Sequence, residues 1–121
     1  MYFFDTYAIF EIINGNEKYE KYKEYPLIVS VLNIAELYAG LLKEKGKGIA
    51  DEWYNKLIFD VLEITSDLII NAVVFRYQHK NEDVSLTDCV GYFLAKKYNL
   101  KFLTGDKFFE NLENVEFVNS R

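Results

Sequence analysis

The stretch Lys101–Asp106, with the sequence KFLTGD, contains the pattern that decides the fold. A short run of β-forming residues, Lys101–Thr104, is followed after one glycine by a carboxylate. Similar short runs lie elsewhere in the chain, at Tyr2–Asp5, Leu27–Ser30, Val61–Ile64 and Val115–Val118. Short runs that are rich in Val, Ile, Leu and Phe are typical of strands, so the sequence predicts a sheet of about five.

The segments between these runs have helical spacing. Apolar residues recur at i, i+3, i+4 and i+7 in Ile34–Leu41, and related spacing is present in Leu68–Phe75 and Val90–Lys97. Strands separated by helices predict an α/β fold with three layers, α/β/α, in which helices cover both faces of a central, mostly parallel sheet. A length of 121 residues fits one domain of ordinary size, so we expect residues 1–121 to form a single domain.

The composition favours a folded protein of the cell interior. A hydrophobic fraction of 50% supplies material for a packed core. Cys89 is the one cysteine, which rules out an intramolecular disulfide and favours a reducing, cytoplasmic setting. The longest apolar stretch, Leu68–Phe75, is broken by Asn71 and is far shorter than the roughly 20 residues that span a bilayer. We therefore expect no contact with a membrane.

Four acids lie where chemistry collects in a parallel sheet. Ligands bind beyond the carboxyl ends of the strands, where the connecting loops begin. Asp5 closes the first expected strand, and Asp106 follows the fourth after Gly105. Glu36 lies a few residues after the second strand, and Asp88 opens the helix that leads into the fourth. The sequence predicts that these carboxylates meet at one edge of the sheet.

Each of these acids has a simpler interpretation as a helix cap. Asp5 and Asp106 stand where helices begin, and acids are common N-cap residues. The spacing of Asn33 with Glu36 resembles a capping box, as does that of Ser85 with Asp88. Four carboxylates at one edge, however, would repel one another and raise their pKa values unless a cation balances them. The combination therefore favours a cation site, although each acid alone favours capping.

The order and spacing of these motifs resemble the PIN-domain ribonucleases, and within them the VapC-type toxins of bacterial and archaeal toxin–antitoxin pairs. The matching stretches are Phe4–Thr6, Asn33–Gly40, Leu86–Asp88 followed by Gly91 and Ala95, and Leu103–Phe109. The resemblance implies RNA cleavage that depends on Mg²⁺ or Mn²⁺, with Asp5, Glu36, Asp88 and Asp106 as the acidic cluster. It also implies a homodimer and a small antitoxin partner. Cys89 departs from the pattern, because a small residue such as Ala is common beside the third acid.

The residue types suit a hard cation. Mg²⁺ prefers oxygen ligands and keeps several waters, so a few carboxylates are enough to hold it. We expect Asp5 and Asp88 to contribute most to the principal ion, with Glu36 and Asp106 holding water or a second ion. Hydrogen-bond donors that would orient these carboxylates are Thr6, Asn33 and Thr104. Alternatively, the two threonines satisfy backbone groups at strand ends.

Other polar residues are weaker candidates. A net charge of −5 argues against strong non-specific binding to the phosphate backbones of nucleic acids, unless the surplus acids bind cations. Lys107, beside Asp106, is a candidate phosphate contact, as are Arg76 and Lys80, whereas His79 lies in a polar run typical of a helix end. Gly46–Gly48 lacks the spacing of a phosphate-binding loop and is predicted to be a turn between helices. Lys18–Lys23 has the alternation of an exposed amphipathic helix and is one candidate docking surface for an antitoxin.

Two other classes of function remain open. One is a non-catalytic α/β interaction module in which the acids only cap helices, and it predicts no specific cation binding. The other is a metal-dependent phosphoryl-transfer enzyme that acts on small phosphates. The absence of a glycine-rich phosphate cradle argues against this second class.

Overall fold

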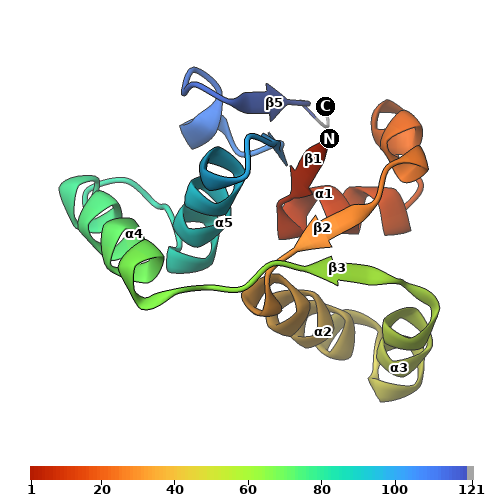
Figure 1. Cartoon of the computed structure of the whole chain (residues 1–121). Coiled ribbons are helices and arrows are strands. Elements are labelled where there is room, and N and C mark those ends of the chain that lie inside the picture. Colours follow the sequence, from red (N-terminus) through yellow and green to blue (C-terminus); the bar gives the residue numbers. More distant parts are fainter. Residues whose placement is uncertain (120–121) are drawn as a thin grey trace.

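The computed structural model describes residues 1–119, whose centre is a five-stranded parallel sheet (Figure 1). The strands are β1 (Tyr2–Phe4), β2 (Leu27–Val29), β3 (Phe59–Val61), β4 (Lys101–Thr104) and β5 (Val115–Phe117). Their order across the sheet is β3-β2-β1-β4-β5, and every neighbouring pair is parallel. The expected α/β fold with a parallel central sheet is confirmed.

The third strand begins two residues earlier and ends three residues earlier than the sequence predicts. Val61–Ile64 was the expected run, whereas β3 is Phe59–Val61. β3 pairs with β2 in a register that sets Leu27 opposite Phe59 and Val29 opposite Val61. The ladder ends where β2 ends, with one last hydrogen bond from Leu62 N to Val29 O. The length of the partner strand, rather than the apolar run itself, therefore sets the bounds of β3.

Five α-helices and two 3₁₀ helices connect the strands within residues 1–119. They are α1 (Thr6–Ile13), the 3₁₀ helix η1 (Glu17–Glu24), α2 (Val31–Lys45), α3 (Lys47–Lys56), α4 (Ser66–Gln78), α5 (Leu86–Lys97) and the 3₁₀ helix η2 (Lys107–Phe109). None of the helices in this described part combines the length and the apolar character needed to cross a bilayer. His79 follows the last residue of α4, at the helix end where the sequence placed it.

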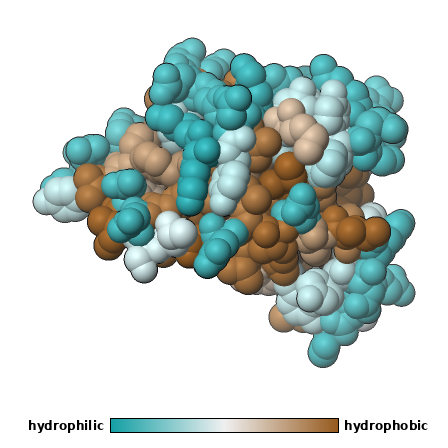
Figure 2. All heavy atoms as spheres, in the orientation of Figure 1, coloured by the Kyte–Doolittle hydropathy of each residue, from teal (hydrophilic) through white to brown (hydrophobic). Residues whose placement is uncertain are grey.

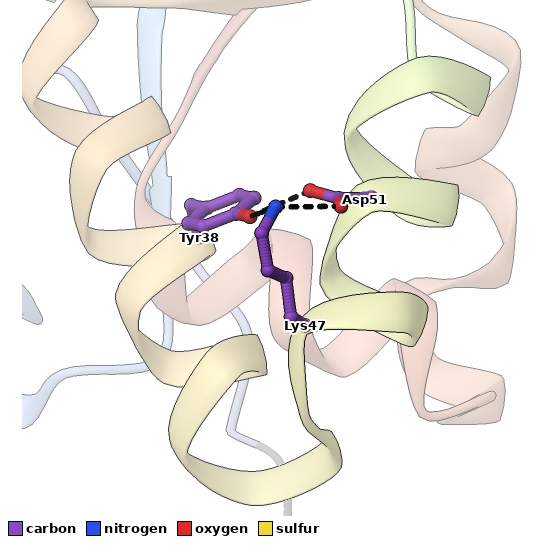
Figure 3. A network of polar contacts seen from close by, with 3 residues as sticks. All are labelled: Tyr38, Lys47 and Asp51. Carbon is purple, nitrogen blue, oxygen red and sulfur yellow. Dashed lines mark hydrogen bonds and ion pairs between the residues drawn. The ribbon is translucent and has the colours of Figure 1, made fainter.

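Gly46 makes the predicted turn between α2 and α3. Its φ of +85° is a left-handed conformation that side chains disfavour. Just beyond the turn, Lys47 approaches Asp51 with Nζ 2.8 Å from Oδ2, and the Tyr38 hydroxyl donates a hydrogen bond of 2.6 Å to Asp51 Oδ1 (Figure 3). The hydrogen bond from Tyr38 joins α2 to α3, whereas the pair of Lys47 and Asp51 lies within α3.

The strands alternate their side chains between two apolar layers. Phe3 and Phe102 face α4 and α5 in one layer, whereas Phe4 and Leu103 face α1, α2 and α3 in the other (Figure 1). Neighbouring residues of a strand point to opposite faces, so a strand covered on both sides is apolar throughout. The expected three layers are therefore present, and the sheet edge between them is where the loops gather.

The Lys18–Lys23 segment is less exposed than predicted. It belongs to η1, in which Tyr19 and Tyr22 are only 0% and 1% exposed. A 3₁₀ helix has three residues per turn, so these two tyrosines lie on the same side and both point inward. Tyr19 donates a hydrogen bond to Val118 O and Tyr22 donates one to Glu116, each of 2.6 Å. The segment is amphipathic, but its aromatic face closes one side of the core.

Candidate metal centre

The candidate site lies at the carboxyl edge of the two central strands. β1 ends at Phe4 and β4 ends at Thr104, so Asp5 and Asp106 both follow adjacent strand ends. The backbone extends this pairing by one residue, because Asp5 N donates to Leu103 O at 3.0 Å. These strand ends bring together two acids that lie about a hundred residues apart in the chain.

All four predicted acids line one cleft of about 410 Å³. Its lining consists of Asp5, Thr6, Tyr7, Glu36, Ser85, Asp88, Gly105, Asp106 and Lys107. The acids come from four different segments: the starts of α1, α5 and η2, and the second turn of α2. Lys107 is the one cation among the described residues that line the cleft.

A larger hollow of about 640 Å³ has different chemistry. It lies at the opposite edge of the sheet, where Pro26 and Ile58 precede β2 and β3. Most of its described lining is apolar or aromatic, and Asp60 is the single acid there. It offers no pair of carboxylates for a hard cation, so the smaller cleft is the better candidate.

Asp5 occupies the N-cap position of α1, but its side chain has another role. Its carboxylate makes no capping hydrogen bond to the described backbone of α1, and Asp5 is only 2% exposed. Instead, Thr104 Oγ1 donates a hydrogen bond of 2.6 Å to Asp5 Oδ2. The capping interpretation is therefore wrong for this side chain, which is held instead by the neighbouring strand.

The negative charges of Asp5 and Asp88 repel each other. Burial raises the pKa of Asp5 well above its usual range, and the charge of Asp88 raises it further, while the Thr104 hydrogen bond lowers it. Burial also raises the pKa of Asp88, as do the charges of Glu36 and Asp106. A hydrogen bond between the two carboxyl groups raises the pKa of Asp5 and lowers that of Asp88. This arrangement is unfavourable for two negative charges and favourable for one shared proton or cation.

Glu36 is oriented by a chain of hydrogen bonds from the neighbouring elements. Thr6 Oγ1 donates to Glu36 Oε1 at 2.9 Å, and Asn33 Nδ2 donates to Thr6 Oγ1 at 3.1 Å. Asn33 Oδ1 in turn accepts from Ser30 N at 2.9 Å and from Ser30 Oγ at 2.8 Å. Because Ser30 is the N-cap of α2, the capping partner of Asn33 is Ser30 rather than Glu36. The expected capping box between Asn33 and Glu36 is wrong, and Glu36 is directed toward α1.

Asp106 and Asp88 do lie in capping motifs. Asp106 Oδ1 accepts a hydrogen bond of 3.0 Å from Phe108 N at the start of η2. At the start of α5, Ser85 Oγ accepts one of 3.1 Å from Asp88 N. Capping is compatible with a place in the cleft for both acids. In α5 the capping side chain is Ser85, so the carboxylate of Asp88 is not used as a cap. In η2 the cap uses only one oxygen of Asp106.

Besides Gly105, which has no side chain, sequence reasoning missed two residues of the lining and underweighted a third. Tyr7 and Ser85 were not candidates for the site, and Lys107 was only a weak one. Ser85 had a usable signal, since it precedes Asp88 by three residues in a capping motif. Tyr7 had none, because its position depends on how α1 leaves the sheet.

The donor set fits a cation held by few protein ligands. Among residues 1–119, no three Asp, Glu, His or Cys side chains are arranged to hold a metal ion together. Mg²⁺ usually takes one or two carboxylates and completes its octahedron with waters and substrate phosphate. The Asp5 and Asp88 pair, with raised pKa values and no histidine nearby in the lining, has the chemistry of such a site.

A parallel five-stranded sheet with an acid-lined cleft at its carboxyl edge defines an α/β protein with a candidate metal site. The chain belongs to the PIN domain family, whose model matches residues 2–115. The family resemblance inferred from the motifs is therefore confirmed. A search of curated proteins gives no match.

Solved structures show the same fold at low sequence identity. A toxin–antitoxin complex from Klebsiella pneumoniae has a TM-score of 0.73 and 19% identity, with 96% of each chain covered. VapC20 of Mycobacterium tuberculosis, described as a toxin that cleaves the sarcin–ricin loop, has a TM-score of 0.74 and 17% identity, with 98% of each chain covered. DNA-bound VapBC from Salmonella typhimurium has a TM-score of 0.68 and 17% identity, covering 99% of this chain and 98% of its own.

Proposed function

We propose that this chain is a divalent-metal-dependent endoribonuclease and the toxin of a toxin–antitoxin pair. The observation that carries the proposal is the meeting of Asp5, Glu36, Asp88 and Asp106 in one cleft at the carboxyl edge of the sheet. Membership of the PIN domain family supports nuclease chemistry, and the likeness in fold to VapC toxins supports the toxin role. On this proposal residues 1–121 are one nuclease domain that acts in the cytoplasm, as a homodimer with a small antitoxin partner.

In this proposal Asp5 and Asp88 hold the principal cation, Mg²⁺ or Mn²⁺, while Glu36 and Asp106 hold water or a second ion. When bound, the cation supplies positive charge for the scissile phosphate and lowers the pKa of a bound water. Thr104 keeps one Asp5 oxygen in place, and Thr6 does the same for Glu36. Asn33 acts through Thr6, which it contacts directly.

Lys107 is assigned the contact with the RNA backbone. It is the single cation in the described lining of a cleft whose other charges are all negative. A positive side chain beside the acids would offset part of the repulsion between the cleft and the phosphates of an approaching strand. The net charge of −5 makes this local positive charge more important for contact with RNA.

The non-catalytic alternative requires that the acids serve only as helix caps. Asp106 fits that requirement, because it accepts from Phe108 N. Asp5 does not, because its carboxylate is buried against Thr104 and makes no capping bond within the described chain. An uncompensated buried acid costs stability, and a cation that binds there accounts for its presence.

The deciding experiment is RNA cleavage by the purified, antitoxin-free chain. Structured RNAs are incubated with the wild type, Asp5→Asn and Glu44→Gln, each with Mg²⁺, with Mn²⁺ and with EDTA. We expect metal-dependent cleavage by the wild type and by Glu44→Gln, whose changed residue is exposed and lies on α2 about 12 Å along the helix axis from Glu36. Asp5→Asn should be inactive. Cleavage that persists in EDTA, or in Asp5→Asn, would refute the assignment of the site.

A further inference from the structure

A second cavity lies beside the acid-lined cleft. Its volume is about 290 Å³, and its described lining combines cations, one acid and apolar side chains: Val73, Arg76, Tyr77, Lys80, Glu82, Val84 and Leu86. Val84 and Leu86 directly flank Ser85, which lines the acid-lined cleft. Neighbouring Cα atoms are about 3.8 Å apart, so the short segment Val84–Leu86 borders both hollows. A polymer that is bound in the cleft can therefore reach this second hollow, which we call the basic cavity.

Two cations in the basic cavity have no acidic partner within residues 1–119. Arg76 lies in the last turn of α4 and Lys80 lies two residues beyond its end, and both are exposed. None of the ion pairs in this described part of the chain includes either side chain. Glu82 is the single acid in the described lining, which therefore holds two positive charges and one negative charge. This surplus favours an anion as the ligand, because like charges repel each other until a counter-charge binds.

Arg76 is held in place by the loop that follows α4. Its Nε donates a hydrogen bond of 3.1 Å to Val84 O. A guanidinium group has several N–H donors in a planar fork, so this bond leaves the others for a ligand. An arginine that is already held in one conformation loses less side-chain entropy on binding, and its fork matches the oxygens of a phosphate.

Lys80 is placed by an aromatic contact. Its Nζ lies over the ring of Tyr77, 4.7 Å from the ring centroid. Tyr77 is 68% exposed, and with Val73 it gives the cavity an apolar part beside the cations. Figure 2 shows the same mixture over α4, at the left of the view, where hydrophobic and hydrophilic residues lie side by side. A nucleotide unit has both kinds of surface, a charged phosphate and the flat faces of a base.

Helix stability alone does not account for this arrangement. Cations are common in the last turn of a helix because they offset the negative end of its dipole. Such a cation would contact the final carbonyl groups of α4, whereas Arg76 binds a carbonyl of the loop that leads into α5. The contact therefore ties Arg76 to the segment that borders the acid-lined cleft.

We propose that the basic cavity is an RNA-binding subsite, in which Arg76 and Lys80 bind a backbone phosphate of the strand whose scissile phosphate lies in the acid-lined cleft. The inference rests on the proposed function for the identity of the ligand. It adds a second point of attachment to that of Lys107, which lines the cleft itself. Two attachment points fix the direction in which the strand crosses Ser85, because each holds a different phosphate.

The test measures binding of a short fluorescent single-stranded RNA by anisotropy, with Mg²⁺ present and Asp5→Asn as the background that prevents cleavage. In this background the pair Arg76→Gln and Lys80→Gln should raise the dissociation constant about tenfold at low salt. The slope of its logarithm against the logarithm of the salt concentration should fall by about 0.7 for each cation removed. If the pair lowers the helix content in circular dichroism, Lys80→Glu replaces it. This variant keeps the contact of Arg76 with Val84 and should also weaken RNA binding.

The matched control is the pair Lys43→Gln and Lys45→Gln, which removes two exposed cations from the last turn of α2. It changes the net charge by the same amount, and the dissociation constant should stay within about twofold of the background. A glutamate-rich peptide with the net charge of the RNA is titrated alongside. Equal weakening by the two pairs would overturn the proposal. So would unchanged RNA binding by the Arg76 and Lys80 pair, or a loss of binding confined to the acidic peptide.

Cleavage assays separate this inference from the proposed function. In the chain that keeps Asp5, the Arg76 and Lys80 pair should raise KM about tenfold and leave kcat within about twofold, because the subsite binds a phosphate that does not react. Cleavage with an unchanged KM would refute the subsite while the nuclease assignment stands. Weaker binding by the pair, together with a wild type that cleaves no RNA, would support the subsite and refute the nuclease.

Discussion

The hydroxyl of Thr104 donates a hydrogen bond of 2.6 Å to Asp5 Oδ2, and this contact joins two residues 99 positions apart. Thr104 is fully buried, and its Oγ1 also accepts a hydrogen bond of 3.0 Å from Asp106 N. One side chain thus positions two of the four acids in the cleft. Removing the Thr104 hydroxyl changes how the carboxylates are held but removes none of them. A substitution at Thr104 therefore tests directly whether the position of these carboxylates matters.

Thr104→Val should weaken metal binding while keeping all four acids. The substitution keeps the shape but loses the donor to Asp5 and leaves Asp106 N without its acceptor, so the free energy of unfolding should fall by about 1–3 kcal/mol. Loss of a residue that orients a ligand typically costs 10–100-fold in metal affinity, and we expect a decrease of that order. Isothermal titration with Mn²⁺ measures it. Thr104→Ser should restore most of the affinity, and equal weakening in both variants would argue against an orienting hydroxyl.

The metal-free protein should lose stability as pH rises above about 4, the ordinary pKa of an aspartate. The pKa of Asp5 is raised in the folded state, by burial first and then by the charge of Asp88. Between the unfolded and the folded pKa the native state binds the extra proton, so this stabilisation is full at low pH and is lost as pH rises through the folded pKa. Urea unfolding in EDTA at a series of pH values measures the slope. Asp5→Asn should flatten it, and an unchanged slope would show that Asp5 is not the group responsible.

Divalent metal should raise the melting temperature of the wild type. A ligand that binds only the folded state stabilises it by about 2.7 kcal/mol at a concentration a hundredfold above its Kd. In Asp5→Asn the increase should be much smaller, whereas Glu44→Gln should respond as the wild type does. Differential scanning calorimetry with Mg²⁺, Mn²⁺ and EDTA makes the comparison, and equal increases in all three proteins would place the ion elsewhere.

Gly91→Ala should destabilise the fold, because α5 lies against the sheet at this point. A Cβ at Gly91 would lie 2.8 Å from a ring carbon of Phe3 and 3.0 Å from one of Phe102. Both rings are fully buried, so they have little room to shift, and overpacking of this kind costs about 1–3 kcal/mol. Gly48→Ala in α3 is the control, since a Cβ there has no neighbour within 4 Å and alanine favours a helix. Chemical denaturation should show opposite signs for the two variants.

Local patterns in the sequence determined the class of fold and the four acids of the candidate site. Apolar periodicity is a property of neighbouring residues, so it indicated where helices and strands alternate and which acids follow strand ends. The same reasoning placed the turn at Gly46 and the helix end at His79. It did not set the bounds of β3, because these depend on where β2 stops offering hydrogen bonds.

Only the tertiary structure decided between a cap and a cleft position for Asp5, and between an exposed and a buried face for the Lys18–Lys23 segment. The position of Asp5 predicted a cap, but the neighbouring strand supplies Thr104 and buries the carboxylate away from the helix. The alternation in Lys18–Lys23 predicted an exposed helix. Its two tyrosines are instead buried, and they donate hydrogen bonds to Val118 O and to Glu116. These partners lie about a hundred residues away in the chain. A pattern of neighbouring residues cannot predict which distant strand a side chain will contact. Physical contact across the fold, rather than residue type, therefore distinguishes a cap from a candidate ligand.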